Sequence, residues 1–321
     1  MTESERPATR GGSAFGTGSG PHTLPAPSGP LESFVIVKRP TRDEVLARLR
    51  DKVARRVPLF IASAGSGLVA KLLEEAGVDI VNTFSGARLR ANGLGTMAMM
   101  WPILDSNEQT LRYTEEDILP ALRGTAAVCA CLNANDPLKD MRAVVRRCLE
   151  MGAISVSNIG PSISYVDKGS TIRAVLEKSG ITFGNEIEML ALAREMGALT
   201  VGLAFDEEDS LSLVREARPH LFCFHAGTTK GGRTGFDSGE SIAETARRTE
   251  AVYRKVRELA PDTLLVAHGA AMETVEDAGF MLANTSGHGF WTGSSTERLP
   301  IEKAVSETAR RFAALRFGAA R

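Results

Sequence analysis

Residues 126–158, AAVCACLNANDPLKDMRAVVRRCLEMGAISVSN, give the clearest indication of the fold. The stretch begins and ends with short apolar runs, residues 126–132 and 153–158, which are continuous rather than alternating. Between them, residues 137–151 carry apolar side chains at helical spacing. Continuous apolar strands are buried on both faces, as in a parallel sheet, and a helical crossover joins such strands. The stretch therefore predicts one βα repeat of a parallel α/β fold.

The same unit recurs along the chain on both sides of this stretch. Strands are predicted at residues 58–63, 79–84, 126–132, 153–158, 199–205, 220–225, 263–267 and 288–292. Helices are predicted at 68–76, 137–151 and 185–196, and others are expected to begin at capping sequences from Thr114, Ser241 and Thr274 and near Pro300. A further helix follows the capping box Thr41–Glu44 and is expected to cover the bottom of the sheet. Eight βα units in series predict a closed (β/α)₈ barrel, the TIM-barrel fold.

Composition narrows the class of protein. The chain has 321 residues, of which 38 are Lys or Arg and 39 are Asp or Glu, and its net charge of -1 predicts binding neither to nucleic acid nor to a membrane surface. The sequence contains no run of about 18 apolar residues, so we expect no membrane-spanning helix. The four cysteines are too few for a disulfide framework, and we expect buried, reduced thiols in a cytoplasmic protein.

The beginning of the chain differs from the rest. Residues 1–34 are rich in Gly, Ser and Pro and contain no apolar segment typical of a secretory signal. Such a composition buries too little apolar surface to offset the entropy lost on ordering. We therefore predict a disordered tail at 1–34 and one barrel catalytic domain at 35–321.

In barrels of this type the functional residues lie in the loops that follow the strands. After the first predicted strand, Gly65-Ser66-Gly67 opens a helix. The amides of Ser66 and Gly67 suit a carboxylate or phosphate, and an ordinary tight turn is the alternative. The glycines also match the dinucleotide fingerprint, but no acid stands at the end of the second strand to hold a ribose. No nicotinamide or flavin cofactor is therefore expected.

After the second strand comes the run SGARLRANGLGT, residues 85–96. We interpret it as a long glycine-rich loop in which Ser85 and Arg88, with Arg90 nearby, contact an anionic substrate. A solvated surface loop is the alternative interpretation.

Polar residues also follow the third and fourth strands. Asp136 precedes a proline and is either a helix N-cap or a metal ligand at the barrel mouth. Asn158 ends the fourth strand and is a candidate substrate contact. Glu186 and Glu188 open the next helix but are two residues apart, so only one can face the mouth. We favour Glu188 as the inward residue and general base.

The last three strands end in further candidate groups. His225 and His268 end neighbouring strands and each precede a small residue, which suits them for proton transfer near neutral pH. The loops around them add candidate contacts to an anionic substrate: Thr229, Gly269, Gly293, Ser294 and Ser295. The sequence contains no G-x-S-x-G nucleophile elbow, no P-loop and no H-E-x-x-H motif.

Taken together, the loop sequences resemble a known family. The pieces AGSGLVAK, SGARLRANGLGT, NDP, GNEIEM, HAGTTKGG, AHGA and GFWTGSSTERLP occur in this order from about Val57 to the C-terminus. Their order and spacing resemble the phosphoenolpyruvate hydrolase-like family, a TIM-barrel group within the phosphoenolpyruvate/pyruvate superfamily. They are also similar to the barrel domain of certain plant virus-resistance proteins.

The resemblance implies a hydrolase or lyase that cleaves a C–C, P–C or P–O bond of a small phosphorylated or 2-oxo-acid substrate. Glu188, His225 and His268 would carry the acid/base chemistry. Relatives of this kind usually use Mg²⁺; here Asp136 is available, but Asn158 stands where an acid would be expected. The resemblance also implies a homo-oligomer. A non-catalytic, ligand-binding regulatory barrel is the alternative function.

Overall fold

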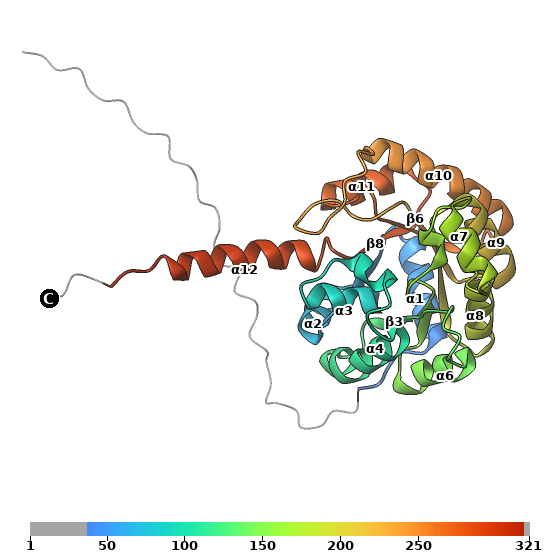
Figure 1. Cartoon of the computed structure of the whole chain (residues 1–321), viewed down its shortest axis with the longest axis horizontal. Coiled ribbons are helices and arrows are strands. Elements are labelled where there is room, and N and C mark those ends of the chain that lie inside the picture. The colour runs from blue at the N-terminus through green and yellow to red at the C-terminus, as the bar shows by residue number, and fades with distance from the viewer. Residues whose placement is uncertain (1–36, 318–321) are drawn as a thin grey trace, which may run out of the picture. The chain divides into compact units, whose positions relative to one another are not determined.

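Eight parallel strands form a closed barrel in the order β1 to β8 (Figure 1). The computed structural model describes residues 37–317, so the predicted tail at 1–34 lies outside the described residues. The strands are β1 (Leu59–Ser63), β2 (Ile80–Thr83), β3 (Ala127–Cys131), β4 (Ser155–Ser157), β5 (Leu199–Ala204), β6 (Leu221–His225), β7 (Leu264–His268) and β8 (Gly289–Thr292). Strand β8 pairs with both β7 and β1, which closes the ring and confirms the predicted fold.

Helices surround this barrel (Figure 1). They are α1 (Arg42–Ala54), α2 (Gly67–Glu75), α3 (Ser85–Ala91), α4 (Ser106–Tyr113), α5 (Leu119–Ala121), α6 (Met141–Met151), α7 (Thr171–Lys178), α8 (Phe183–Glu195), α9 (Glu207–Ala217), α10 (Ile242–Leu259), α11 (Val275–Asn284) and α12 (Arg298–Ala313). The shorter helical turns are η1 (Thr96–Met100), η2 (Thr114–Ile118) and η3 (Ile163–Tyr165). Within residues 37–317, none of these helices has both the length and the apolar character needed to cross a bilayer.

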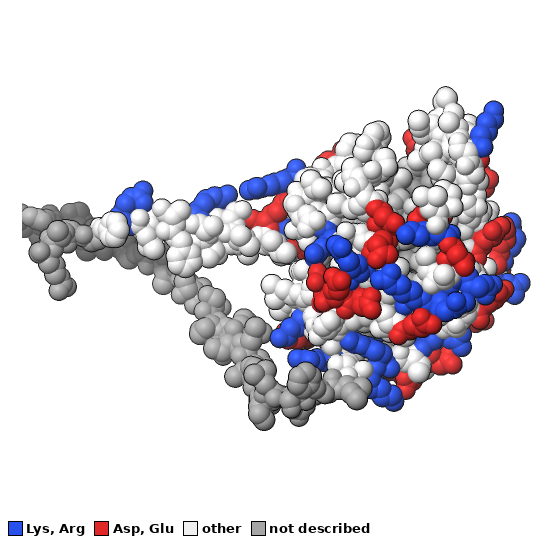
Figure 2. Space-filling view, turned by 60° about the horizontal axis from the view of Figure 1, so that its bottom comes forward, with Lys and Arg blue, Asp and Glu red and all other residues white. Residues whose placement is uncertain are grey.

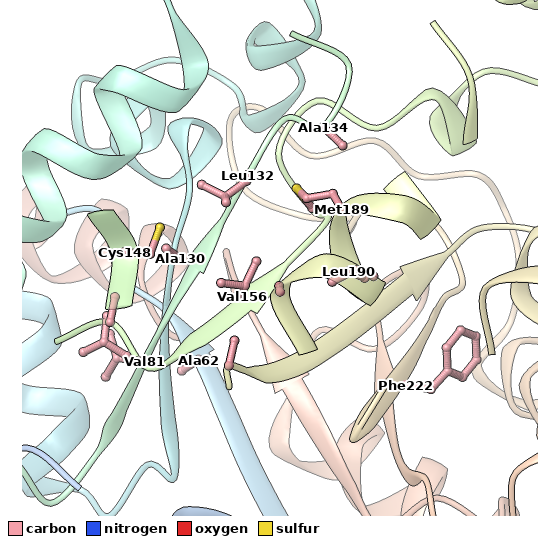
Figure 3. Packing of buried hydrophobic residues seen from close by; sticks show 14 of the residues in the cluster. Ala62, Val81, Ala130, Leu132, Ala134, Cys148, Val156, Met189, Leu190 and Phe222 are labelled. Atoms are coloured by element: carbon pink, nitrogen blue, oxygen red, sulfur yellow. The ribbon is translucent and has the colours of Figure 1, made fainter. Parts of the chain in front are cut away.

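The strand side chains divide between two cores. Ile61, Cys129 and Trp291 belong to the cluster inside the barrel, together with Val45 and Leu49 of α1. Helix α1 therefore contacts the inner core, as expected for a helix that covers the bottom of a barrel. Side chains that point the other way fill the layer between strands and helices, as Figure 3 shows for Val81, Val156 and Phe222. All four cysteines are buried free thiols, as predicted.

The segment between β2 and β3 differs from its prediction. Residues 85–91 form the helix α3 rather than a loop, and α4 begins at Ser106 after the N-cap Asp105. The predicted cap Thr114 lies inside the helical run, where its hydroxyl donates a 2.6 Å hydrogen bond to the Thr110 carbonyl. Gly86 lies within α3, whereas Gly93 and Gly95 lie between α3 and η1, so the segment forms short helices instead of one long loop.

Two other helix starts also differ from prediction. Helix α6 is capped by Asp140, whereas Asp136 closes the preceding turn by accepting a hydrogen bond from the Leu138 amide at 3.0 Å. The interpretation of Asp136 as an N-cap is therefore wrong. Helix α12 begins at Arg298, two residues before Pro300.

Candidate active site

A cavity of about 160 Å³ opens at the carboxyl ends of the strands. Its lining comes from β1, β6 and β7, from the segments that follow β2, β4, β6 and β8, and from the first residue of α12. It includes Ser63, Arg90, His225, His268 and Gly293. A cavity of roughly 150 Å³ is large enough for a benzene molecule. The space therefore suits a ligand of about six heavy atoms, such as a small organic acid.

His225 and His268 lie side by side on one wall of this cavity. They are register partners on β6 and β7, and their rings meet edge to face with centroids 4.4 Å apart. Phe205 stacks on His225 with ring centroids 4.1 Å apart, and Gly227 donates its amide to His225 Nδ1 at 3.2 Å. The prediction that the two histidines stand at equivalent positions of neighbouring strands is confirmed.

Glycine at position 269 makes this close approach possible. Gly269 has a φ of +86°, in the left-handed region that favours glycine. A Cβ on Gly269 would stand 2.0 Å from the Gly227 carbonyl oxygen and 3.0 Å from the His225 ring. Its role is thus to shape the turn beneath the histidines, and it does not line the cavity.

The two histidines are neutral near pH 7, because burial lowers the pKa of both. Burial lowers the pKa of His268 to about 4, an effect to which the Arg90 guanidinium adds and which the hydrogen bond to Trp291 opposes. Burial also lowers the pKa of His225 well below its usual range, and His268 and Arg248 act in the same direction.

Their hydrogen bonds assign opposite tautomers. His225 Nδ1 accepts the Gly227 amide, so the proton of the neutral ring is on Nε2. His268 Nδ1 lies 2.6 Å from the Trp291 carbonyl oxygen, which can only accept, so Nδ1 carries the proton and Nε2 has a free lone pair. One histidine can therefore donate a proton through Nε2 while its neighbour accepts one.

A buried arginine also lines the cavity. Arg90 binds Glu297 Oε2 through Nε at 3.0 Å and Nη2 at 2.7 Å, and binds Thr96 Oγ1 through Nη1 at 3.1 Å. These bonds use three of the five guanidinium N–H groups, which leaves one on each terminal nitrogen. A Cβ placed on Gly293 would stand 3.8 Å from Arg90 Nη1 and Nη2 and from His268 Cε1. A ligand atom near that point would contact Arg90 and His268 together.

A second arginine and a loop complete the mouth. Arg298, the first residue of α12, lines the cavity and donates to the Gly231 carbonyl at 3.0 Å. The loop after β6 contributes Thr228, Thr229 and Phe236 to the lining. Of the substrate-binding residues predicted from sequence, Thr229, Gly293 and Ser294 line the cavity.

The remaining predicted contacts lie elsewhere. Ser66 caps α2, and Gly67 packs against the Asp117 backbone. The hydroxyl of Ser85 pairs with that of Ser106 at 2.7 Å. Asn158 bridges β4 to β5 through both the amide and the carbonyl of Leu203. Ser295 is half-buried but outside the lining.

The two arginines of the run 85–96 take different roles from those predicted. Arg88 points away from the cavity and pairs with Asp117 at 2.8 Å, while Arg90 faces it. Residues two apart on a helix point in different directions, so the helical conformation of α3 separates them. Both arginines stand in the glycine-rich run, so the sequence signals both, but the helical conformation that selects Arg90 is not evident from a run rich in glycine.

The inward glutamate on α8 is Glu186, so the preference for Glu188 is wrong. Glu188 is exposed, whereas Glu186 is fully buried. Glu186 accepts hydrogen bonds from Asn158 at 2.6 Å, from Ser162 and from the Ile163 amide. Burial raises the pKa of Glu186 to about 8 against the effect of these bonds. Glu186 does not line the cavity. Its hydrogen bonds to Ser162 and Ile163 instead hold the loop after β4 in place.

The residues of the mouth do not fit a protein-held Mg²⁺. No aspartate or glutamate lines the cavity, whereas Mg²⁺ sites usually include one or two carboxylates. Across residues 37–317, no three His, Cys, Asp or Glu side chains come together as a metal cluster would require. Asp136 lies outside the lining and accepts from Leu138 and Asn107.

Comparison with known proteins finds a matching family and two similar proteins of Solanum lycopersicum. The family described as phosphoenolpyruvate hydrolase-like matches residues 44–315. The ToMV resistance protein Tm-1(GCR237) and the ToMV susceptible protein tm-1(GCR26), both of Solanum lycopersicum, are each 32% identical to this chain over 272 and 269 residues. Each match covers 84% of this chain and 35% of the relative, so the chain spans about a third of their length.

Solved structures share the barrel fold at low sequence identity. Phosphoenolpyruvate phosphomutase from Streptomyces platensis subsp. rosaceus has a TM-score of 0.55 at 16% identity, with 84% of this chain and 87% of that chain covered. Phosphonopyruvate hydrolase in complex with oxalate and Mg²⁺ has a TM-score of 0.54 at 14% identity, with 85% and 87% covered.

Proposed function

Since the chain belongs to the phosphoenolpyruvate hydrolase-like family, we propose that it is a hydrolase or lyase acting on a small 2-oxo acid or its enol phosphate. The observation that carries the proposal is the His225–His268 pair, two neutral imidazoles of opposite tautomer on one wall of a small cavity. Such a pair provides a general base and a hydrogen-bond donor without any change of the resting protonation state.

The geometry assigns a role to each wall. A substrate carboxylate would bind the two free N–H groups of Arg90, with Arg298 nearby. His268 Nε2 would then take a proton from the substrate or from an attacking water. His225 Nε2–H would donate to the oxygen on which negative charge develops when the bond next to the 2-oxo group breaks. The buried cavity strengthens both interactions, because less water screens them.

Two neighbours by fold support this choice of substrate class. The structural relatives named above are a mutase of phosphoenolpyruvate and a hydrolase of phosphonopyruvate, and the latter was bound to oxalate. Oxalate has the size and charge of a 2-oxo-acid enolate, so it is a suitable first probe for the cavity. Mg²⁺ has no carboxylate to bind in this mouth, and no step of the proposal depends on it.

A turnover screen tests the proposal. Oxaloacetate, phosphonopyruvate and phosphoenolpyruvate would be incubated with the protein and followed by ¹H and ³¹P NMR. We expect turnover of a 2-oxo acid that oxalate inhibits, a loss of at least about a hundredfold in His268→Asn and His225→Asn, and unchanged turnover in Glu188→Gln, whose side chain is exposed. Full activity in both histidine variants would refute the assignment.

A binding function without turnover is the second candidate, favoured by the relatives named for resistance or susceptibility to a virus. It predicts that oxalate or a 2-oxo acid raises the melting temperature, since a ligand at 100 times its Kd stabilises by roughly 2.7 kcal/mol. It also predicts no product from any acid in the screen. Product formation would exclude it.

A further inference from the structure

A basic groove lies at the end of the barrel opposite the candidate active site. It has a volume of about 440 Å³ and is bounded by the residues that lead into β6 and β7 and by the ends of α8, α9 and α10. Both strands begin at this end, whereas the cavity with the two histidines lies at their carboxyl ends. We call this surface the basal groove. Its charged and titratable lining residues are Arg50, Arg194, Arg215, Arg218, His220 and Asp262.

The charges of the basal groove are not balanced by carboxylates of the described chain. Four arginines face one aspartate, and across residues 37–317 none of these five side chains belongs to an ion pair. Basic and acidic side chains are interspersed over the barrel face in Figure 2, so an excess of arginines at one site is a local feature. Like charges that converge repel one another, and a bound anion would relieve this repulsion.

Two observations show that the arginines converge. The Arg194 guanidinium donates through Nη1 to the Arg218 carbonyl at 2.6 Å, which holds it beside the end of α9. This bond uses one of the guanidinium N–H groups and leaves the others to contact a ligand. Burial also lowers the pKa of Arg194, and the charges of Arg42 and Arg218 lower it further. The positive groups around Arg194 are therefore close enough to act together on one anion.

A half-buried histidine adds a neutral donor to the groove. His220 Nδ1 accepts the Thr200 amide at 3.0 Å, so Nε2 carries the proton of the neutral ring. Burial lowers the pKa of His220 to about 4, and nearby arginines, Arg194 foremost, act in the same direction. The ring is thus neutral near pH 7. Within residues 37–317 the hydrogen bonds of this ring involve Nδ1 alone, so Nε2–H is available to a ligand.

Interaction with helix ends accounts for only part of this cluster. Basic residues in the last turn of a helix complement the negative end of its dipole, as Arg194 does in α8 and Arg215 in α9. Arg50, however, precedes the last turn of α1. Arg218 lies beyond the end of α9 with a φ of +46°, a left-handed conformation usually taken by glycine. The helix dipoles therefore do not explain Arg50 and Arg218.

We propose that the basal groove binds a diphosphate group, either free or as part of a nucleotide. Guanidinium groups bind phosphate oxygens in pairs, and two linked phosphates place several negative charges within reach of converging arginines. A single carboxylate would balance only one of these arginines. The volume of the groove lies in the range of small-molecule sites, roughly 300–1,000 Å³. Apolar residues complete the lining and give an organic group a surface to pack against: Val214, Pro219, Leu259 and Pro261.

Isothermal titration calorimetry of the full chain with inorganic pyrophosphate and with ADP tests the proposal. Salt at about 0.15 M screens long-range attraction, and we expect saturable binding of one ligand per chain. Arg218→Gly should weaken this binding at least about tenfold without lowering the melting temperature, because glycine suits the left-handed backbone. Arg194→Gln should also weaken it. Arg56→Gly is the matched control: Arg56 is exposed, has a φ of +58° and lies outside the groove lining, so the affinity should be retained.

The two ligands separate the two sources of the diphosphate. Tighter binding of ADP would support a nucleotide, and equal or tighter binding of pyrophosphate would support the free ion. An absence of binding, or an equal loss of affinity in Arg56→Gly, would overturn the proposal. Binding that survives both Arg218→Gly and Arg194→Gln would place the anion elsewhere, such as beside Arg90, and would also overturn it. A uridine oligonucleotide that binds more tightly than ADP and is lost in Arg218→Gly would replace the proposal with a nucleic-acid site.

Discussion

The ion pair between Arg90 and Glu297 lies in the cavity wall, and its removal should be costly. Both side chains are almost fully buried, with 2% and 3% exposed. Glu297 accepts three hydrogen bonds, two from Arg90 and one from the Gly65 amide at 2.6 Å. Glu297→Gln leaves the guanidinium buried without a counter-charge and turns an amide N–H₂ toward groups that can only donate. Breaking a buried pair by removing one partner costs about 3–5 kcal/mol.

Urea unfolding at pH 7 and 25 °C measures this loss. The control is Glu116→Gln, which makes the same chemical change in an exposed pair, Arg112–Glu116, at 4.0 Å with 61% and 65% exposure. Exposed pairs contribute about 0–1 kcal/mol, so the control should unfold near the wild-type midpoint. The double variant Arg90→Met with Glu297→Leu should recover much of the lost stability, because it leaves no unpaired charge. A loss below about 1 kcal/mol in Glu297→Gln would refute the reasoning, since the pair would then be worth no more than an exposed one.

Four further predictions concern the cavity and the turn beneath it. Gly293→Ala should leave stability within about 0.5 kcal/mol of wild type yet weaken oxalate binding at least tenfold by calorimetry, since its Cβ stands at ordinary contact distance, 3.8 Å, between Arg90 and His268. Gly269→Ala should instead lose more than about 1 kcal/mol in urea unfolding. The pKa of His268 is about 4 in the folded protein, below the unfolded value of roughly 6.5. The stabilisation of the protein by neutral His268 is therefore fully present above pH 6.5 and is lost as the pH falls toward 4. In His268→Asn, the urea midpoint should fall less steeply over this pH range. Adding Mg²⁺ should change the affinity for oxalate less than about threefold, because no carboxylate lines the mouth to bind the ion. An absolute requirement for Mg²⁺ would contradict this prediction.

Local sequence patterns predicted the barrel and the end of it at which His225 and His268 lie. Continuous apolar runs that alternate with capped helical segments can bury their side chains on both faces in a parallel sheet covered by helices. Both patterns are local in the chain. The residue at which each strand ends can also be predicted from the local sequence. His225 and His268 could therefore be placed at adjacent strand ends and at one edge of the sheet without knowledge of the tertiary structure.

Which of two similar side chains turns inward depends on the tertiary structure. Arg88 and Arg90, or Glu186 and Glu188, are chemically alike and two residues apart, so the choice depends on where a helix begins and which face packs. Glu297 follows β8 and Arg90 lies on α3 after β2, and only the closure of β8 onto β1 brings these distant segments together. The direction of α12 is likewise set by contacts with the loop after β6, which no periodicity in the helix records. Local sequence patterns thus determine the helices and strands, whereas contacts between residues distant in sequence determine which side chains lie together.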